Sequence, residues 1–212
     1  MKKIFKFLFF LFLLINISVL ISGKTWIYKG VFITYLKGHF SSYIYDFVHF
    51  PANTIQVGKH QEWLISKNYN KSDLPKFINK TNKELETIAL IIIQNDSIQY
   101  EEYWHGYSAD SMSNSFSMSK SWISTLIGTA IKDKKIKNID QKVCDFIPEF
   151  CKGDNANITI KHLLTMSSGL DWKEGYKNPF GQTAEAYYGD QLRELVVNLK
   201  SVEDPGKVFK YH

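Results

Sequence analysis

Apolar and β-branched residues form two runs of strand length in the middle of the chain. The first, "ETIALIIIQ", covers residues 86–94, and the second, "IQYEEYWHGY", covers residues 98–107. A polar stretch from Asn95 to Ser97 separates the two runs. Two such runs joined by a short Asn-Asp turn predict an antiparallel β-hairpin.

A helical pattern begins after this hairpin. Apolar residues recur in adjacent pairs every four residues from Trp122 to Ile131, which predicts a helix with one well-buried face. We expect this helix to end between Lys132 and Lys135. The densest lysine cluster of the chain, residues 132–137, lies at this end, where positive charges interact favourably with the helix dipole.

Two further helices are predicted nearer the C-terminus. The segment "TIKHLLTMSSG", residues 159–169, offers Thr159 as an N-cap and Gly169 as a stop. Residues 183–200 show a third helical pattern. The apolar faces of these helices are expected to consist of Leu163, Leu164 and Met166 in the first, and of Leu192, Leu195, Val196 and Leu199 in the second.

The first 23 residues have the layout of an export signal. Three lysines lie within the first six residues, and an apolar run follows from Phe7 to Ile21. This order is typical both of a cleaved signal peptide and of an N-terminal signal-anchor, and both alternatives stay open. In either case we expect the rest of the chain to lie outside the cytoplasm, in the periplasm or anchored to the membrane. Residues 24–82 are interpreted as an extension of unknown role.

The composition is that of a core-forming chain rather than a disordered one, with 44% hydrophobic and 15% aromatic residues. A net charge of +5 suggests nucleic acid as a partner, but the lysines are scattered among acidic residues. Arg193 is the only arginine, so bidentate phosphate contacts are nearly absent. We therefore expect no nucleic-acid partner.

The two cysteines, Cys144 and Cys151, lie seven residues apart. In an oxidising compartment they can form a disulfide, but two free thiols are an equal alternative, because spacing alone sets no geometry. The histidines show no spacing typical of a metal site. We expect no metal and no other cofactor.

A serine-rich stretch, "SFSMSKSWISTLIG", begins the predicted helix and places Lys120 three residues after Ser117. Residues at this spacing share a helix face, and the first turn of a helix has free N–H groups and a positive dipole end. Lysine is unfavourable at that end unless it has a specific role. A desolvated, neutral lysine amine can accept the proton of a neighbouring serine, which predicts a nucleophile and its base. His162 and Asp171 are interpreted as structural residues.

Three blocks of the sequence resemble a known family, the serine hydrolases of the β-lactamase and penicillin-binding protein superfamily. Residues 115–150 resemble its nucleophile helix and the loop that follows. "ITIKHLLTMSSGLDW", residues 158–172, resembles the next marker, a helix ending in Ser-Gly, and "PGKVFKY", residues 205–211, resembles the segment that carries a catalytic tyrosine. The match is with the class C-like branch, which includes class C β-lactamases, D-aminopeptidases, esterases and nylon-oligomer hydrolases.

The resemblance implies a role for three residues. Ser117 would be the nucleophile, with its N–H as an oxyanion donor; Lys120 would be the proton acceptor, and Tyr211 would relay the proton to the leaving group. The implied protein is an exported serine hydrolase that cleaves an amide, ester or β-lactam bond in a small-molecule or peptide-like carbonyl substrate. The implied fold is α+β and β-lactamase/transpeptidase-like, with an antiparallel sheet flanked by helices and a helical subdomain, in a domain that covers residues 83–212.

Two features of the family are missing from the sequence. The family's tyrosine is usually followed two residues later by a small polar residue, whereas His212 is the last residue here. The Lys- or His-x-Gly strand that supplies a second oxyanion donor is also absent. We therefore expect these residues to be the N-terminal portion of a longer hydrolase, incomplete at its C-terminus.

Two other functions were weighed against this hypothesis. A membrane-anchored binding or sensor protein of the same fold, without catalytic turnover, is favoured by the missing strand and disfavoured by the presence of Ser117, Lys120 and Tyr211. A serine hydrolase of the α/β-hydrolase fold is disfavoured because the sequence has no G-x-S-x-G motif.

Overall fold

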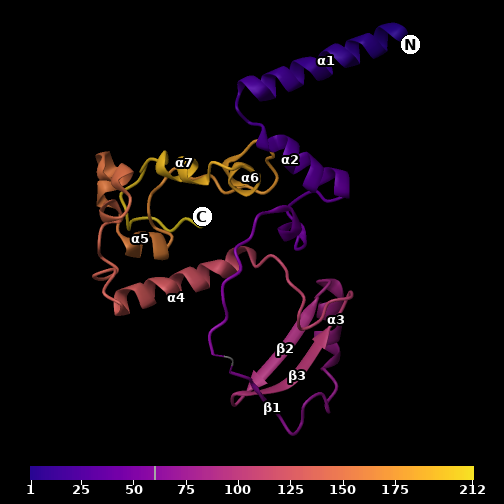
Figure 1. The fold of residues 1–212 in the computed structure, drawn as a ribbon, viewed down its shortest axis with the longest axis vertical. Coiled ribbons are helices and arrows are strands. Elements are labelled where there is room, and N and C mark those ends of the chain that lie inside the picture. Colours follow the sequence, from indigo (N-terminus) through magenta and orange to yellow (C-terminus); the bar gives the residue numbers. More distant parts are fainter. Residues whose placement is uncertain (60) are drawn as a thin grey trace. The chain divides into compact units, whose positions relative to one another are not determined.

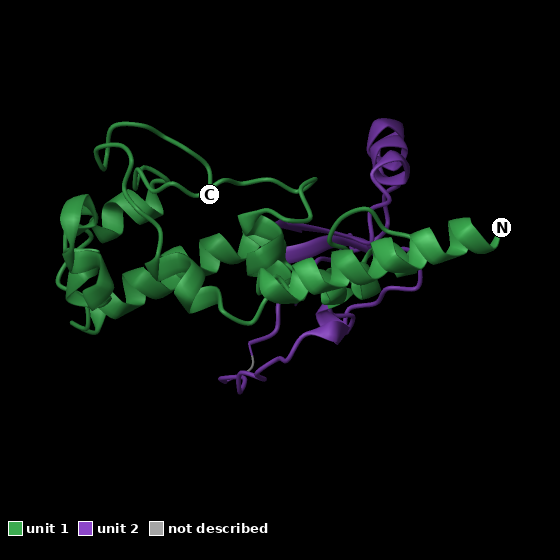
Figure 2. Cartoon of the chain, turned by 90° about the horizontal axis from the view of Figure 1, so that it is seen from above, with its two compact units in different colours: residues 1–46, 115–212 green, residues 47–114 purple. Residues whose placement is uncertain are grey.

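The computed structural model describes residues 1–59 and 61–212, which divide into two compact units. The larger unit joins residues 1–46 to residues 115–212, and the smaller consists of residues 47–114 (Figure 2). The segment interpreted as an extension from the sequence, residues 24–82, is therefore shared between the two units.

The smaller unit contains a three-stranded sheet with the strand order β1-β3-β2 (Figure 1). In the hairpin of β2 and β3, Ala89 pairs with Tyr103 and Gln94 pairs with Ser97, as the sequence predicted. β1 is parallel to β3, so this sheet is mixed and not wholly antiparallel. The elements of this unit are β1 (Leu64–Ile65), α3 (Lys76–Glu84), β2 (Ala89–Gln94) and β3 (Ser97–Tyr103).

The turn of this hairpin consists of Asn95 and Asp96, which both have left-handed backbone angles, with φ of 48° and 55°. A two-residue turn of this kind matches the twist of the strands on either side. Asn and Asp tolerate the left-handed region better than other non-glycine residues. The Asn-Asp pair therefore closes the hairpin, as predicted from the sequence, and the strand pairing shifts once between Ile92 and Ile93.

The larger unit is helical. Together with the small sheet, its helices confirm the predicted α+β class. The helices are α1 (Lys2–Ile21), α2 (Trp26–Ile33), α4 (Ser119–Lys132), α5 (Ile160–Leu164), α6 (Gln182–Tyr188) and α7 (Leu192–Val197), with 3₁₀ turns at Tyr35–Lys37, Phe116–Met118, Val143–Asp145, Pro148–Cys151 and Gly153–Asn157.

Helix α1 has 20 residues and none of them is buried. At 1.5 Å per residue it spans about 30 Å, close to the thickness of the hydrocarbon core of a bilayer. By length and composition this helix can cross a membrane, and a signal sequence near the N-terminus meets the same criteria. The structure therefore leaves the choice between signal peptide and signal-anchor open.

Helix α4 ends at Lys132, where the lysine cluster predicted its end. The predicted buried face, however, is wrong for the residues that the structure describes. Trp122 is 70% exposed, and Ile123 and Leu126 are also more than half exposed. The side chains of the main core cluster come instead from segments that follow α4 in the chain.

That core is a compact cluster of apolar side chains beside a buried asparagine. Asn155 donates a hydrogen bond from Nδ2 to the Leu199 carbonyl at 2.8 Å and accepts one from the Ser201 N–H at 2.7 Å. Both contacts satisfy polar groups that would be costly to bury unpaired. They fix residues 199–201 against the loop after α4. The apolar members of the cluster are Val143, Phe150, Ile158, Leu170 and Leu199.

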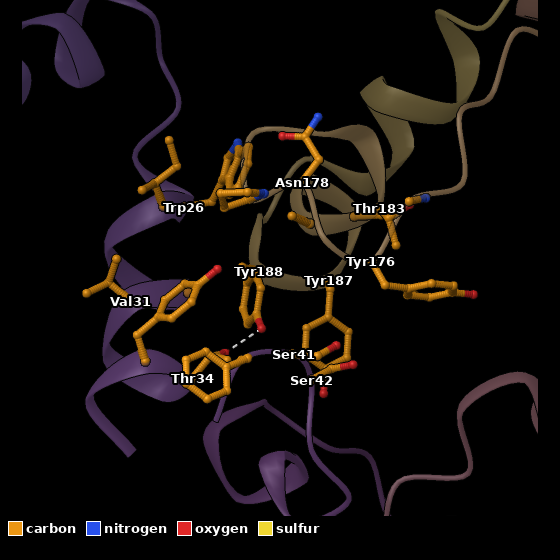
Figure 3. Close-up of a pocket in the computed structure, with 18 of the residues that line it drawn as sticks. Trp26, Val31, Thr34, Ser41, Ser42, Tyr176, Asn178, Thr183, Tyr187 and Tyr188 are labelled. Atoms are coloured by element: carbon orange, nitrogen blue, oxygen red, sulfur yellow. Dashed lines mark hydrogen bonds between the residues drawn. The ribbon is translucent and has the colours of Figure 1, made fainter. Parts of the chain in front are cut away.

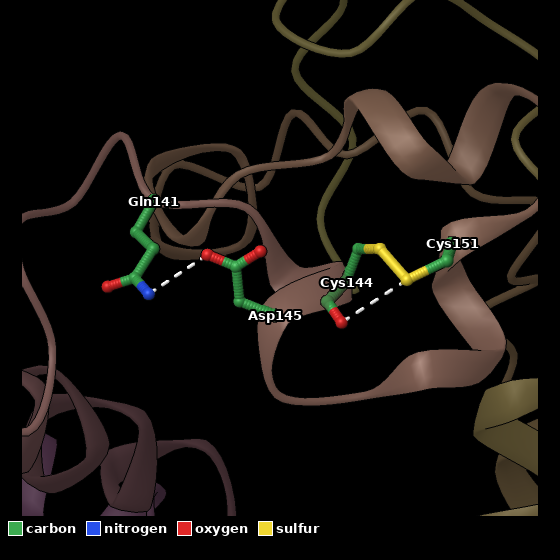
Figure 4. Close-up of a disulfide and its surroundings, with 4 residues drawn as sticks. All are labelled: Gln141, Cys144, Asp145 and Cys151. Atoms are coloured by element: carbon green, nitrogen blue, oxygen red, sulfur yellow. Dashed lines mark hydrogen bonds between the residues drawn. A yellow bond between two sulfur atoms is a disulfide. The ribbon is translucent and has the colours of Figure 1, made fainter.

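Cys144 and Cys151 form a disulfide in the structure, with their Cα atoms 4.8 Å apart (Figure 4). The side chain of Cys144 packs against the core cluster, which includes Val143 and Phe150. Of the two alternatives that the sequence left open, the structure has the disulfide. It closes the loop that contributes Phe150 to the core.

The two C-terminal helices predicted from the sequence differ from those observed. The first, α5, ends at Leu164, well before Gly169, and its buried residue is Ile160, whereas Leu163 is 40% exposed. The second is divided into α6 and α7, because the backbone becomes extended at Gly189. Of the predicted apolar face, Leu192 is 53% exposed and the buried Leu199 lies beyond the end of α7, so periodicity predicted helical structure here but neither its interruption nor its buried face.

Candidate active site

Ser117 and Lys120 lie at the start of the nucleophile helix predicted from the sequence. Ser117 is in the 3₁₀ turn Phe116–Met118, which leads directly into α4, and Lys120 is in the first turn of α4. The amine of Lys120 donates a hydrogen bond to Ser117 Oγ at 3.2 Å. Ser117 is exposed and Lys120 is half-buried, so the amine is less enclosed than the sequence hypothesis assumed.

The backbone just before the serine is in an unusual conformation. Phe116 has a φ of 43°, in the left-handed region that bulky residues rarely adopt. The hydroxyl of Ser119 donates a hydrogen bond to the Phe116 carbonyl at 2.7 Å and holds this turn closed. Strained backbone of this kind is often found where a side chain must be presented in one orientation. Here the turn presents Ser117 beside the amine of Lys120.

Tyr211 reaches the site because two of the sequence blocks pair with each other. The segment after α7 runs beside the segment after α5: the Val202 N–H donates to the Gly169 carbonyl at 2.9 Å, and the Lys210 N–H donates to the Met166 carbonyl at 2.8 Å. Residues 166–169 therefore hold residues 202–210 in place, and this pairing brings Tyr211 to the start of α4.

The three predicted residues are brought together in the larger unit. The amine of Lys120 lies 5.0 Å from the centre of the Tyr211 ring. Hydrogen bonding with Ser117, and next with Lys120, lowers the pKa of the Tyr211 phenol, and the positive charge of Lys120 adds to this effect. Partial burial and the carboxylate of Glu174 oppose it. A phenol with a lowered pKa gives up its proton more readily, which suits a proton relay.

Sequence reasoning missed one residue of this site, Glu174. Its carboxylate accepts a hydrogen bond from the Trp172 indole at 2.5 Å. A hydrogen bond to Glu174 also raises the pKa of Tyr176 to about 12, with smaller effects from burial and from Glu174's charge. Glu174 lies five residues after Gly169, and this position was the one signal that could have identified it.

The two residues interpreted as structural have structural contacts. His162 and Thr159 form a capping box at the start of α5, in which the His162 N–H donates to Thr159 Oγ1 and the Thr159 N–H donates to His162 Nδ1 at 3.2 Å. Asp171 accepts a hydrogen bond from the Lys200 N–H at 2.9 Å. Within residues 1–59 and 61–212 there is no cluster of three or more His, Cys, Asp or Glu side chains that could hold a metal ion.

The family model for the β-lactamases matches residues 74–212, which is more than half of the chain. The chain belongs to the β-lactamase family. Its match begins before the expected domain boundary at residue 83 and includes Ser117, Lys120 and Tyr211. None of the curated proteins matches this β-lactamase family member.

One solved structure agrees with this assignment at the level of the fold. The β-lactamase family member is similar to a protein from Bacillus anthracis named as a 6-aminohexanoate-dimer hydrolase, with 18% identity and a TM-score of 0.57. That similarity covers 72% of the chain and 45% of the other protein, so the chain spans less than half of its length. A second structure, from Bacteroides dorei and named as a β-lactamase, has 19% identity and a TM-score of 0.46 over 64% of the chain and 40% of its own.

Proposed function

We propose that this protein is a serine hydrolase in which Ser117 forms an acyl-enzyme with an amide, ester or β-lactam substrate. The observation that carries the proposal is the 3.2 Å contact between Lys120 Nζ and Ser117 Oγ, beside a tyrosine whose pKa the same two residues lower. Serine alone is a weak nucleophile, and an adjacent base is the feature that activates it.

In the proposed reaction, the amine of Lys120 accepts the hydroxyl proton while Ser117 Oγ bonds to the carbonyl carbon. The N–H of Ser117, at the start of a helix, stabilises the negative charge on the carbonyl oxygen. Tyr211 protonates the leaving group as its bond to the carbonyl breaks, and recovers a proton from Lys120. Water then attacks the acyl-enzyme and releases the acid and the free serine.

A fluorescent alkyl phosphonate tests the nucleophile, because it forms a stable adduct with an activated serine. We expect labelling of the wild-type protein and none of Ser117→Ala, whereas Ser124→Ala, an exposed serine of the same helix, should label normally. A phosphonate adduct that persists in Ser117→Ala would refute the assignment of the nucleophile.

Substitutions of Lys120 test the base separately. Loss of a general base typically costs about 10²–10⁴-fold in rate. Lys120→Met and Lys120→Arg should both slow labelling by this factor, because arginine keeps the charge but does not accept a proton. Lys132→Met, at the other end of α4, is the matched control. Full activity in Lys120→Arg would show that only the charge of this residue matters.

A binding or sensor protein without turnover is the alternative that these experiments exclude or support. Such a protein would form no Ser117-dependent adduct and would release no product from an ester.

We also propose that the larger unit works outside the cytoplasm, supported by α1 and by the Cys144–Cys151 disulfide, which is typical of oxidising compartments. Digestion of the protein by protease added to intact spheroplasts would test this, and N-terminal sequencing would distinguish cleavage from anchoring.

A further inference from the structure

The larger unit contains a pocket of about 320 Å³ between α2 and α6, called here the α2–α6 pocket. This volume is at the lower end of the range of small-molecule sites, which is about 300–1,000 Å³. One wall comes from α2, with Trp26 and Val31, and the opposite wall from α6, with Tyr187 and Tyr188 (Figure 3). The α2 wall lies outside the residues that match the β-lactamase family.

The two walls are held together by contacts that use the polar atoms of the pocket. The hydroxyls of Thr34 and Tyr188 lie 2.6 Å apart, and the hydroxyl of Tyr187 donates to the buried carboxylate of Asp46 at 3.2 Å. Gly30 lies so close to the Tyr188 ring that a Cβ would stand 3.2 Å from it. These three hydroxyls are therefore paired with groups of the wall. The buried indole N–H of Trp26 has no hydrogen-bond partner among the residues that the structure describes, and most of the other lining side chains are aromatic or aliphatic.

The α2–α6 pocket shares residues with the surroundings of Ser117. Phe116, the residue before the nucleophile, lines the pocket, and its ring stacks on that of Tyr187 with the centroids 6.4 Å apart. Tyr176 also lines the pocket and lies close enough to Tyr211 for their charges to interact. A substrate whose carbonyl is at Ser117 can therefore place another part of itself in the pocket.

The pocket is also close in the chain to the helix that can cross a membrane. Helix α1 ends at Ile21 and α2 begins at Trp26. Even a fully extended link of this length reaches only about 17 Å. With α1 in a bilayer, the α2 wall would therefore lie at the membrane surface. Tyr28, an exposed aromatic residue of α2, is of the type enriched at this depth.

From these observations we propose that the α2–α6 pocket binds an unbranched alkyl chain of the substrate, so that the enzyme acts on amphiphilic esters or amides at the membrane surface. This proposal rests on the proposed function of Ser117. The alkyl chain can belong either to the acyl group or to the leaving group, and both give the same apolar contacts with Trp26, Phe116 and Tyr188.

Two ester series distinguish these sources. In one, the acyl chain of p-nitrophenyl esters is lengthened from acetate to decanoate; in the other, acetate esters carry alcohols of the same lengths. Complete burial of one methylene contributes about 0.8 kcal/mol, so kcat/KM should rise about three- to fourfold per methylene in one series, until the pocket is full. Equal kcat/KM for short and long chains in both series would overturn the proposal.

A binding measurement separates this proposal from the catalytic one. Decanoate and the neutral 1-decanol are titrated by calorimetry into Ser117→Ala, which has no nucleophile. We expect both to bind, and decanoate to bind at least tenfold more tightly than octanoate, by the same gain per methylene. If the wild type forms no phosphonate adduct but decanoate binds, the proposed function fails and the alkyl site stands. Absence of binding by both probes overturns the alkyl site, whatever the activity.

A blocking variant locates the bound chain. Ala186→Phe adds a ring inside the pocket and should weaken decanoate binding at least tenfold without slowing the hydrolysis of acetate esters. Ala52→Phe, the same change at an exposed loop position of the smaller unit, is the matched control. If Ala186→Phe does not fold by circular dichroism, Ala184→Phe, which also lines the pocket, replaces it. Unchanged decanoate affinity in a folded blocking variant would overturn the assignment.

Discussion

The carbonyl oxygen of Glu203 lies so close to Gly169 that a β-carbon on this residue would stand 2.1 Å from it. Gly169 also has a φ of 74°, which other residues adopt only with strain. Glycine is therefore needed at position 169 because the segment that leads to Tyr211 approaches it closely. It does not end a helix there, since α5 ends at Leu164.

Replacement of Gly169 by alanine should displace this chain. We expect Gly169→Ala to lose at least about 2 kcal/mol of stability, because both the clash and the left-handed backbone oppose the new side chain. The phosphonate labelling rate should fall with it. Gly58→Ala, where a β-carbon meets nothing within 4 Å, is the control. Thermal unfolding with wild-type midpoint in Gly169→Ala would contradict the close approach.

Glu174 and Lys120 should shift the pKa of Tyr211 in opposite directions. Lys120 lowers this pKa, so Lys120→Met should raise it; Glu174 raises it, so Glu174→Gln should lower it. The measurement is an NMR titration of ¹³Cζ-labelled tyrosine, with Tyr211→Phe to assign the signal. A shift in the same direction in both variants would show that the two charges do not act on Tyr211 as the structure indicates.

His162 should make the stability of the larger unit depend on pH. Burial, and next the charges of Lys142 and Lys161, lower the pKa of His162 below its ordinary value of 6.5. The folded state therefore favours the neutral ring, whose Nδ1 accepts the capping hydrogen bond from Thr159. The stabilisation is present above the unfolded pKa and is lost as the pH falls through the folded pKa.

Glutamine at this position tests the origin of that dependence. His162→Gln retains a capping-box side chain but does not titrate. The thermal unfolding midpoint of the wild type should be lower at about pH 5 than at about pH 7. This difference should be smaller in His162→Gln. An identical pH dependence in the two proteins would assign the effect to other groups, such as His212, whose pKa burial also lowers.

Loss of the disulfide should destabilise the core cluster. Closing a loop of this size stabilises a folded protein by about 2–3 kcal/mol in the chain-entropy model. We expect Cys144→Ala/Cys151→Ala to lower the free energy of unfolding by this amount, and dithiothreitol to have the same effect on the wild type but none on the double variant. An effect of dithiothreitol on the double variant would point to another cause.

The local features of this chain were readable from its sequence. The Asn95–Asp96 turn, the end of α4 at Lys132 and the cap at Thr159 each depend on residues adjacent in the chain. The contact between Ser117 and Lys120 follows from a three-residue helical spacing in the same way. Such features are determined by local backbone preferences, which act before any tertiary contact forms.

The features that join distant segments were not predicted. Tyr188 and Thr34 lie on segments separated by most of the chain, and no periodicity indicates that α2 packs on α6. Glu174 likewise interacts with both Trp172 and Tyr176, and no sequence pattern indicates that these two side chains lie beside its carboxylate. The exposed face of α4 was mispredicted for a related reason, because an apolar stripe indicates a potential contact surface and not what covers it.

The pairing of residues 166–171 with residues 200–210 also determines when the site can form. During synthesis, Ser117 and Lys120 emerge well before Tyr211, and residues 166–171 have no partner until residues 200–210 have followed them. A growing chain that stops short of residues 200–210 therefore brings Ser117 and Lys120 together without Tyr211. The proposed relay is the last part of the site to be assembled, so acyl transfer is expected only once the whole of residues 115–211 is present.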